Sequence, residues 1–202
     1  SKKKRFNMKK LKLNILTSKN SWLYRNKKQS IIKELKKFSS KIKLITNFKK
    51  IEKNNDCLII GSYYKIIPKK YLSLSKFNLL VHESDLPKGR GFSPLYWQIL
   101  NGSQNITTTI LEANENVDEG NYYIKKKFYY PKEIFFDEIK QRQFQNAIYL
   151  VKKVLKKIKL KKKIKNFKQS GKPTYFRRRS KKDSELSVKS SLKKQINLLR
   201  II

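Results

Sequence analysis

The sequence predicts an α/β protein with a Rossmann-like, doubly wound and mostly parallel sheet, followed by a basic helical extension at the C-terminal end. Two observations support this prediction. Short apolar runs, typical of buried strands, alternate with segments whose apolar residues recur at helical spacing. The chain has 202 residues, 38% of them hydrophobic, which is enough for one domain with a core. Strands that alternate with helices form a parallel sheet whose faces the helices cover.

The first half of the chain supplies four predicted strands. Residues 11–16 alternate and then become apolar, as a strand does, and residues 17–21 form a polar loop with good helix-capping side chains. Residues 22–38 carry apolar side chains at helical spacing. The further strands predicted from short apolar runs are residues 42–46, 56–60 and 77–81, and residues 68–72 form a short helix with Pro at its start.

The second half adds two β-branched or aromatic strands and one long helix. The predicted elements are a helix at residues 94–100, strands at 106–111 and 121–130, and helices at 133–160 and 192–199. Hydrophobicity is low after residue 171. We therefore divide the chain into one domain over residues 1–170 and a basic C-terminal segment over residues 171–202.

The formal net charge of +37 has three interpretations. Lysine-rich blocks bind nucleic acid or anionic membranes, they complement an anionic substrate, or they form a solvated surface. We favour the third interpretation, because Lys is spread along the whole chain and Arg is scarce outside residues 177–179.

The cellular location is inferred from what the sequence does not contain. The single cysteine, Cys57, excludes an intramolecular disulfide, and its apolar neighbours predict a buried strand residue. No apolar run approaches transmembrane length, and residues 1–8 are basic without the apolar stretch of a signal peptide. We therefore expect a cytoplasmic protein.

The only histidine, His82, directly follows the predicted strand 77–81. Open α/β sheets bind ligands at the carboxyl ends of their strands, so His82 is expected in a ligand crevice and not as an inert surface or core residue. Residues 78–123 hold only two basic residues against six acidic ones, and one of these acids, Asp118, is a candidate partner for the imidazole. A histidine held by a carboxylate is typical of proton transfer. One His and one Cys are too few for zinc, so we predict no metal site.

A set of short motifs begins at His82 and continues in a fixed order. The motifs are His82-Glu-Ser-Asp-Leu-Pro-Lys-Gly-Arg-Gly91, Ser93-Pro-Leu-Tyr-Trp97, Asn101-Gly102, Thr109 and Val117-Asp-Glu-Gly120. Together they resemble the folate-dependent formyltransferase family, which includes methionyl-tRNA, glycinamide ribonucleotide and sugar N-formyltransferases. The resemblance covers roughly residues 56–130 and implies a fold of the formyltransferase type, with the catalytic domain in residues 1–170.

The resemblance implies an enzyme that moves a formyl group from N10-formyltetrahydrofolate, its formyl donor, to an amine. His82 and Asp118 match the catalytic His and Asp of the family. The family also has an Asn two residues before the His, and this position is Leu80 here. Asn78 shares the strand face but lies about 7 Å further along. Because Leu80 cannot polarise a formyl carbonyl, the oxyanion must be stabilised by other groups.

The resemblance also indicates which residues contact the two substrates. The pterin is expected beside the segment after the third strand and the loop that contains Asp118. The expected folate contacts are Tyr64, Ile66, Ile67, Pro68, Leu86, Asn114, Val117 and Gly120. The expected acceptor contacts are Ser84, Lys88 and Arg90 in the turn after His82, and Lys19 and Asn20 at the end of the first strand. Protonated His82, Ser84 and the backbone N–H groups of residues 85–91 are candidate oxyanion donors.

The His82 motif and the tail at residues 174–186 most resemble sugar N-formyltransferases of cell-surface amino-sugar pathways. We therefore predict a nucleotide-linked amino sugar as acceptor, and we expect a truncated chain because more chain follows this tail in those proteins. Two alternatives stay open. One is a methionyl-tRNA formyltransferase-like enzyme, although 202 residues leave no room for its usual C-terminal barrel domain. The other is a catalytically decayed, basic nucleic-acid-binding protein. A homodimer is one alternative for the oligomeric state.

Overall fold

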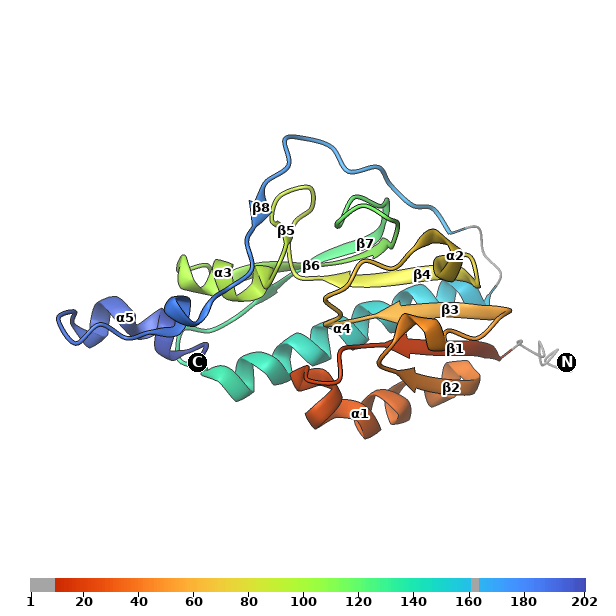
Figure 1. Ribbon diagram of the computed structural model, residues 1–202, viewed down its shortest axis with the longest axis horizontal. Helices are drawn as coiled ribbons and strands as arrows, with labels where there is room; N and C mark the ends of the chain where they lie inside the picture. Colours follow the sequence, from red (N-terminus) through yellow and green to blue (C-terminus); the bar gives the residue numbers. More distant parts are fainter. Residues whose placement is uncertain (1–9, 161–163) are drawn as a thin grey trace, which may run out of the picture.

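A six-stranded sheet forms the centre of the computed structural model, which describes residues 10–160 and 164–202 (Figure 1). Its strands, in spatial order, are β2 (Ser39–Ile45), β1 (Leu11–Leu16), β3 (Asn55–Ile60), β4 (Ser75–His82), β6 (Asn105–Glu112) and β7 (Tyr122–Tyr129). Strands β1 to β4 pair in parallel, and β6 and β7 are antiparallel to their neighbours. This arrangement confirms the predicted α/β class and the mostly parallel sheet.

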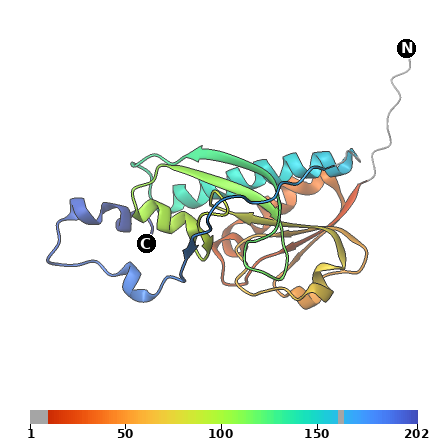
Figure 2. The same ribbon diagram turned by 90° about the horizontal axis from the view of Figure 1, so that it is seen from above.

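Helices cover both faces of the sheet, as a doubly wound fold requires. Helices α1 (Trp22–Leu35) and α4 (Phe136–Lys159) lie together on one face and bury the larger hydrophobic core against β1, β3 and β4 (Figure 2). The short helix α2 (Lys69–Leu72) and the 3-10 turn η2 (Phe48–Lys50) contribute to a second core on the opposite face. Because the parallel strands run the same way, the carboxyl ends of β1, β3 and β4 meet at one edge of the sheet.

Local signals in the sequence explain where the helices begin and end. The Ser21 side chain accepts a hydrogen bond of 3.1 Å from the Tyr24 N–H and caps the start of α1. Helix α1 continues into the 3-10 turn η1 (Lys36–Phe38), so the helical segment ends at Phe38 as predicted. Helix α4 starts at Phe136 rather than at residue 133, because the Glu138 carboxylate accepts from the Phe135 N–H and thereby caps the helix there.

A second, two-stranded parallel sheet was not predicted. Strand β5 (Arg90–Gly91) pairs with β8 (Tyr175–Phe176), flanked by backbone hydrogen bonds of 2.9 Å from Arg90 to Thr174 and 3.0 Å from Phe92 to Phe176. Gly91 permits this pairing, since its φ of 93° suits glycine and a Cβ there would overlap the carbonyl oxygen of Phe176. The β5–β8 pairing thereby holds the C-terminal segment against the residues that follow His82.

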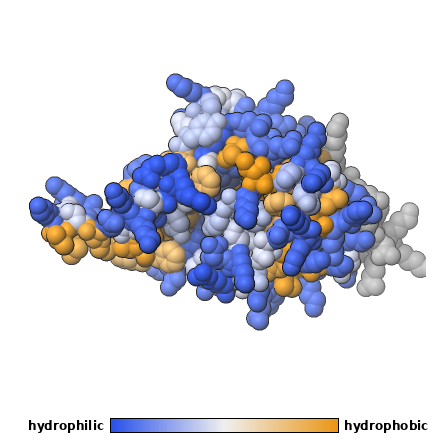
Figure 3. All heavy atoms as spheres, in the orientation of Figure 1, coloured by the Kyte–Doolittle hydropathy of each residue, from blue (hydrophilic) through white to orange (hydrophobic). Residues whose placement is uncertain are grey.

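The C-terminal segment also packs on helix α3 (Pro94–Leu100). After the 3-10 turn η3 (Lys181–Ser184), helix α5 (Leu192–Leu199) lies against α3, and Ile201 is buried in a third core cluster with residues of α3 and α4. Apolar side chains remain exposed along this segment: Leu186, Val188, Leu192 and Ile196. Figure 3 shows hydrophobic surface at its lower left, where the C-terminal segment lies. Within the described residues, no helix combines the length and the apolar character needed to span a membrane.

Candidate active site

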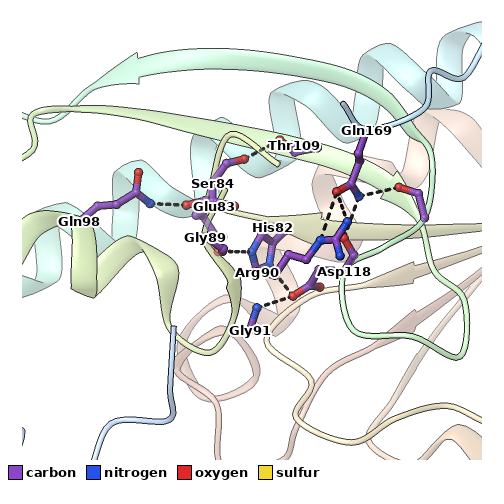
Figure 4. Close-up of polar contacts among 11 residues, drawn as sticks. His82, Glu83, Ser84, Gly89, Arg90, Gly91, Gln98, Thr109, Asp118 and Gln169 are labelled. Atoms are coloured by element: carbon purple, nitrogen blue, oxygen red, sulfur yellow. Dashed lines mark hydrogen bonds and ion pairs between the residues drawn. The ribbon is translucent and has the colours of Figure 1, made fainter. Parts of the chain in front are cut away.

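His82 is the last residue of β4 and lies at the sheet edge where the parallel strands end. Its side chain is only 5% exposed. The Nε2 atom is 2.8 Å from the carbonyl oxygen of Gly89 (Figure 4). Because a carbonyl oxygen only accepts hydrogen bonds, Nε2 carries a proton and donates it to this bond. The turn after β4 therefore leaves Nδ1 as the ring nitrogen that can exchange a proton.

Asp118 approaches His82 from the loop that joins β6 to β7. This loop starts beside Asn78, where the Ala113 N–H donates to the Asn78 carbonyl, and then folds back toward the end of β4. The Asp118 Oδ2 lies 3.6 Å from His82 Nδ1 and accepts a hydrogen bond of 2.8 Å from the Gly91 N–H. Both side chains are buried, so the carboxylate faces the imidazole with little water around it. The two predicted catalytic residues are thus brought together.

Gln169 fixes the Asp118 loop from the C-terminal segment. Its Nε2 donates to the carbonyl oxygens of Asp118 at 2.7 Å and Gly120 at 2.8 Å (Figure 4). Its Oε1 accepts from Arg90 Nη2 at 2.9 Å and from Nε at 3.3 Å. Asp118 has a φ of 54°, a backbone conformation that costs free energy in residues other than glycine. The Gln169 contacts help to hold the loop in this conformation. No periodic pattern in the sequence marks Gln169.

The His82–Asp118 pair lines a cavity of about 210 Å³. Two loops supply parts of its wall: residues 62–67 after β3 and residues 113–118 after β6. Among the expected folate contacts, those that line the cavity are Tyr64, Ile66, Ile67, Asn114 and Val117. Ile66 is 63% exposed and Val117 is 42% exposed, so each loop presents a large apolar side chain at the cavity.

The other expected folate contacts lie outside the cavity wall. Pro68 directly precedes α2, and Leu86, which belongs to the turn after His82, is fully buried. At Gly120, a Cβ would overlap the carbonyl oxygen of Glu112. A glycine is therefore needed for the loop to return to β7.

None of the five expected acceptor contacts lines this cavity. Ser84 is buried, and its carbonyl oxygen accepts a hydrogen bond of 2.7 Å from the Thr109 hydroxyl. The Arg90 guanidinium is buried against Gln169 and pairs with Glu119 at 2.7 Å, so it stabilises the Asp118 loop. The remaining three residues, Lys88, Lys19 and Asn20, are exposed.

Leu80, at the position of the family's Asn, lines the cavity with an apolar side chain. Asn78 does not replace the missing amide, since its Nδ2 and its backbone N–H both donate to Glu112 Oε1 at 3.1 Å. Glu112 also accepts a hydrogen bond from the Tyr123 hydroxyl. Burial raises the pKa of Glu112, and the hydrogen bonds from Tyr123 and Asn78 oppose this rise. This cluster belongs to the base of the Asp118 loop and not to the cavity.

Helix α4 contributes polar groups to the cavity that the sequence did not reveal. Lys140 and Gln143 line it together with Glu83, the residue after His82. Gln143 bridges the other two, because its Oε1 accepts from Lys140 Nζ at 2.6 Å and its Nε2 donates to Glu83 Oε1 at 2.7 Å. Burial lowers the pKa of Lys140 to about 8, and the nearby Glu83 carboxylate opposes this effect. The helical pattern of residues 133–160 concealed Lys140 among the many lysines of α4.

Other reactive side chains lie away from this site. Cys57 is fully buried on β3, as predicted, and burial raises the pKa of its thiol. Across residues 10–160 and 164–202, no three His, Cys, Asp or Glu side chains are grouped so that they could hold a metal ion.

The sequence matches the model of a known protein family. The family model described as formyl transferase matches residues 25–155, which is more than half of the chain. The chain belongs to the formyl transferase family. The match includes both His82 and Asp118, together with the loops that surround them.

Individual members of the formyl transferase family match shorter or more divergent stretches. The methionyl-tRNA formyltransferase of Ehrlichia ruminantium (strain Gardel) is 39% identical over 77 residues, which cover 38% of this chain and 25% of that protein. The match thus spans about a quarter of the length of that curated relative.

Two solved structures show the same fold. The methionyl-tRNA formyltransferase from Clostridium thermocellum superposes with a TM-score of 0.73 at 25% identity, covering 95% of this chain and 83% of that one. An N-formyltransferase from Helicobacter canadensis, in complex with folinic acid and dTDP-3-aminofucose, superposes with a TM-score of 0.68 at 19% identity, covering 94% and 80% of the two chains.

Proposed function

We propose that this chain transfers a formyl group from N10-formyltetrahydrofolate to the amine of a nucleotide-linked amino sugar. The observation that carries the proposal is the buried His82–Asp118 pair in the wall of a cavity between two loops. Membership of the formyl transferase family supports the reaction type. A solved N-formyltransferase of the same fold, in complex with folinic acid and dTDP-3-aminofucose, supports the choice of substrates.

The chemistry of the cavity wall fits a folate. Tyr64, Ile66 and Val117 are partly exposed apolar side chains on the two loops, and they suit the faces of a flat ring system. Asn114 adds a carboxamide, and the loop backbones add N–H and C=O groups that suit the polar edge of a pterin. When bound, N10-formyltetrahydrofolate supplies the formyl carbon and the departing nitrogen.

The His82–Asp118 pair would manage the proton of the acceptor amine. Only a free amine attacks a formyl carbon, so a base must be able to take the proton that the amine loses. His82 Nε2 is held by the Gly89 carbonyl, which directs this role to Nδ1. The Asp118 carboxylate, 3.6 Å from Nδ1, balances the charge of the imidazolium that forms. A protonated His82 can then stabilise the oxyanion, which Leu80 cannot do, and return its proton to the departing nitrogen.

A second acceptor, methionyl-tRNA, is favoured by a specific observation. The relative from Ehrlichia ruminantium is a methionyl-tRNA formyltransferase at 39% identity. The net charge of +37 also suits a polyanionic acceptor. The two acceptors differ in whether the amine belongs to a sugar or to an aminoacyl ester, so product analysis separates them. A decayed nucleic-acid-binding protein would transfer nothing to either.

The test is mass spectrometry of products after incubation with N10-formyltetrahydrofolate and a panel of dTDP- and UDP-linked amino sugars, with methionyl-tRNA in a parallel reaction. A formylated sugar that is absent with His82→Ala supports the proposal. Formylation of methionyl-tRNA alone would replace the acceptor and keep the reaction type. Folate binding without any product contradicts both acceptors, and a chain that neither binds folate nor forms product belongs to the decayed class.

A further inference from the structure

We propose that Lys140 forms an oxyanion-binding subsite in the cavity and that a phosphate group of the acceptor occupies it. The inference deepens the proposed function, on which the identity of the acceptor rests. It names a residue of α4 that the sequence motifs around His82 do not include. It also assigns a class of ligand to the part of the cavity formed by α3 and α4.

Lys140 is a buried ammonium group with few partners. Its side chain lies in the cavity wall and the residue is 8% exposed. The Nζ atom donates to Gln143 Oε1 at 2.6 Å, which uses one of its three N–H groups. The rings of Trp22 and Tyr96 lie 5.5 and 5.4 Å away. None of the ion pairs found among the described residues includes Lys140.

This environment favours an anionic ligand. A buried ammonium group loses much of its hydration, and aromatic rings with one carboxamide replace it only in part. The lowered pKa of Lys140, about 8, reports this loss. The nearby Glu83 carboxylate is linked to Lys140 through Gln143 and forms no direct ion pair with it among the described residues. Because the ammonium group borders a cavity rather than a closed core, an oxyanion that enters the cavity can pair with it directly.

Two arginines add positive charge at aromatic rings of the cavity wall. The Arg179 guanidinium lies 5.4 Å from the Tyr96 ring, which also contacts Lys140. The Arg178 guanidinium lies 5.2 Å from the Phe92 ring. Both rings line the cavity. Lys140 and Arg179 thus share the Tyr96 ring, and Arg178 lies over Phe92, so three cations border aromatic rings of the cavity wall, an arrangement that attracts phosphate.

The acceptor is a better occupant than the folate. Lys140 is linked to the residue after His82, since Gln143 bonds both Lys140 Nζ and Glu83 Oε1. The His82–Asp118 pair also belongs to the wall. An acceptor whose amine reaches His82 Nδ1 can therefore place a second group near α4. A nucleotide-linked sugar carries a diphosphate, which can form a direct ion pair with Lys140.

The test is calorimetric titration of the full chain with inorganic pyrophosphate at an ionic strength of about 0.15 M, where distant surface charges are screened. We expect Lys140→Met to weaken binding by about tenfold or more, the usual effect of losing a charged hydrogen bond. Lys156→Met, which removes an exposed lysine from the same helix, should bind as the wild type does. Lys140→Gln serves as a second variant if Lys140→Met fails to fold.

Two results would overturn the proposal. One is equal pyrophosphate affinity in the wild type and both Lys140 variants. The other is loss of pyrophosphate binding when the protein is saturated with folinic acid, because the subsite would then hold the folate carboxylates. A protein that binds pyrophosphate through Lys140 but does not transfer formyl groups would contradict the proposed function and keep the oxyanion subsite.

Discussion

Replacing Gln169 by Ala should loosen the Asp118 loop. The change removes two donated hydrogen bonds, to the carbonyls of Asp118 and Gly120, and two accepted ones from Arg90. A neutral hydrogen bond contributes about 1 kcal/mol to folding, and one to a charged group about 1.5–3 kcal/mol. Gln169 is only half-buried, so in the variant water replaces part of the lost hydrogen bonding. We expect a loss of about 1–3 kcal/mol in the free energy of unfolding.

The effect on formyl transfer should exceed the effect on stability. Asp118 keeps its φ of 54° only while its surroundings enforce it, and a displacement of about 1 Å at a reacting group costs roughly a hundredfold in rate. We therefore expect kcat to fall about 10- to 100-fold with little change in the acceptor KM. Hydrogen exchange in residues 114–120 should accelerate, and this readout does not depend on the acceptor.

Gln169→Glu separates the two functions of this side chain. A carboxylate still accepts from Arg90, but it has no N–H for the carbonyls of Asp118 and Gly120. We expect Gln169→Glu to keep more stability than Gln169→Ala, because the Arg90 contact remains, together with the faster loop exchange and the lower kcat. If both variants exchange residues 114–120 at the wild-type rate and keep the wild-type kcat, the loop does not depend on Gln169 and this reasoning is wrong.

Three further predictions concern the rest of the site. His82→Ala and Asp118→Ala should each abolish product formation while the far-ultraviolet circular dichroism spectrum stays native; full activity in either variant contradicts the proposed proton transfer. Lys140→Met should be more stable than the wild type at pH 7 by up to about 3 kcal/mol, because the folded-state pKa of about 8 lies below the ordinary lysine pKa of about 10.5. Between these two pKa values the unfolded chain binds more protons than the folded one, so the stability advantage of the variant should disappear by about pH 10.5 in thermal melts. A stability difference between the variant and the wild type that does not depend on pH would refute this prediction. Gly91→Ala should lower the melting temperature far more than Gly171→Ala. Both glycines have a positive φ, but only a Cβ at Gly91 would overlap the Phe176 backbone. Equal decreases in melting temperature would show that the β5–β8 pair does not need a glycine at position 91.

The fold was predictable because its signals are local. The apolar run of β3 and the helical spacing of α1 each lie within one short window, and the Ser21 cap lies next to the helix that it starts. Helix α4 starts three residues later than predicted, because the Glu138 carboxylate caps the helix at the Phe135 N–H, although the apolar pattern begins upstream. The β5–β8 pair was missed because two-residue strands carry no periodicity and these two are 85 positions apart, as in Arg90 and Tyr175.

The candidate site was only partly predictable, for a related physical reason. His82 and Asp118 belong to a motif in which residue type and order carry the information, and the structure brings them together. Arg90 belongs to the same motif, yet its position near His82 did not reveal that its guanidinium turns away to Glu119 and Gln169. The direction of a side chain depends on partners from distant segments, which neighbouring sequence does not specify.

Lys140 illustrates the limit most clearly. As one lysine among many on α4, it has nothing in its sequence context that separates it from exposed Lys156 on the same helix. The difference arises only when α4 packs beside α1 and α3, which surround Lys140 with Trp22 and Tyr96 and leave its ammonium group at the cavity. A high net charge conceals such a residue, because composition treats all lysines alike while burial makes one of them chemically distinct. In a very basic chain, the functional cation is therefore best sought among buried lysines rather than in the densest basic run.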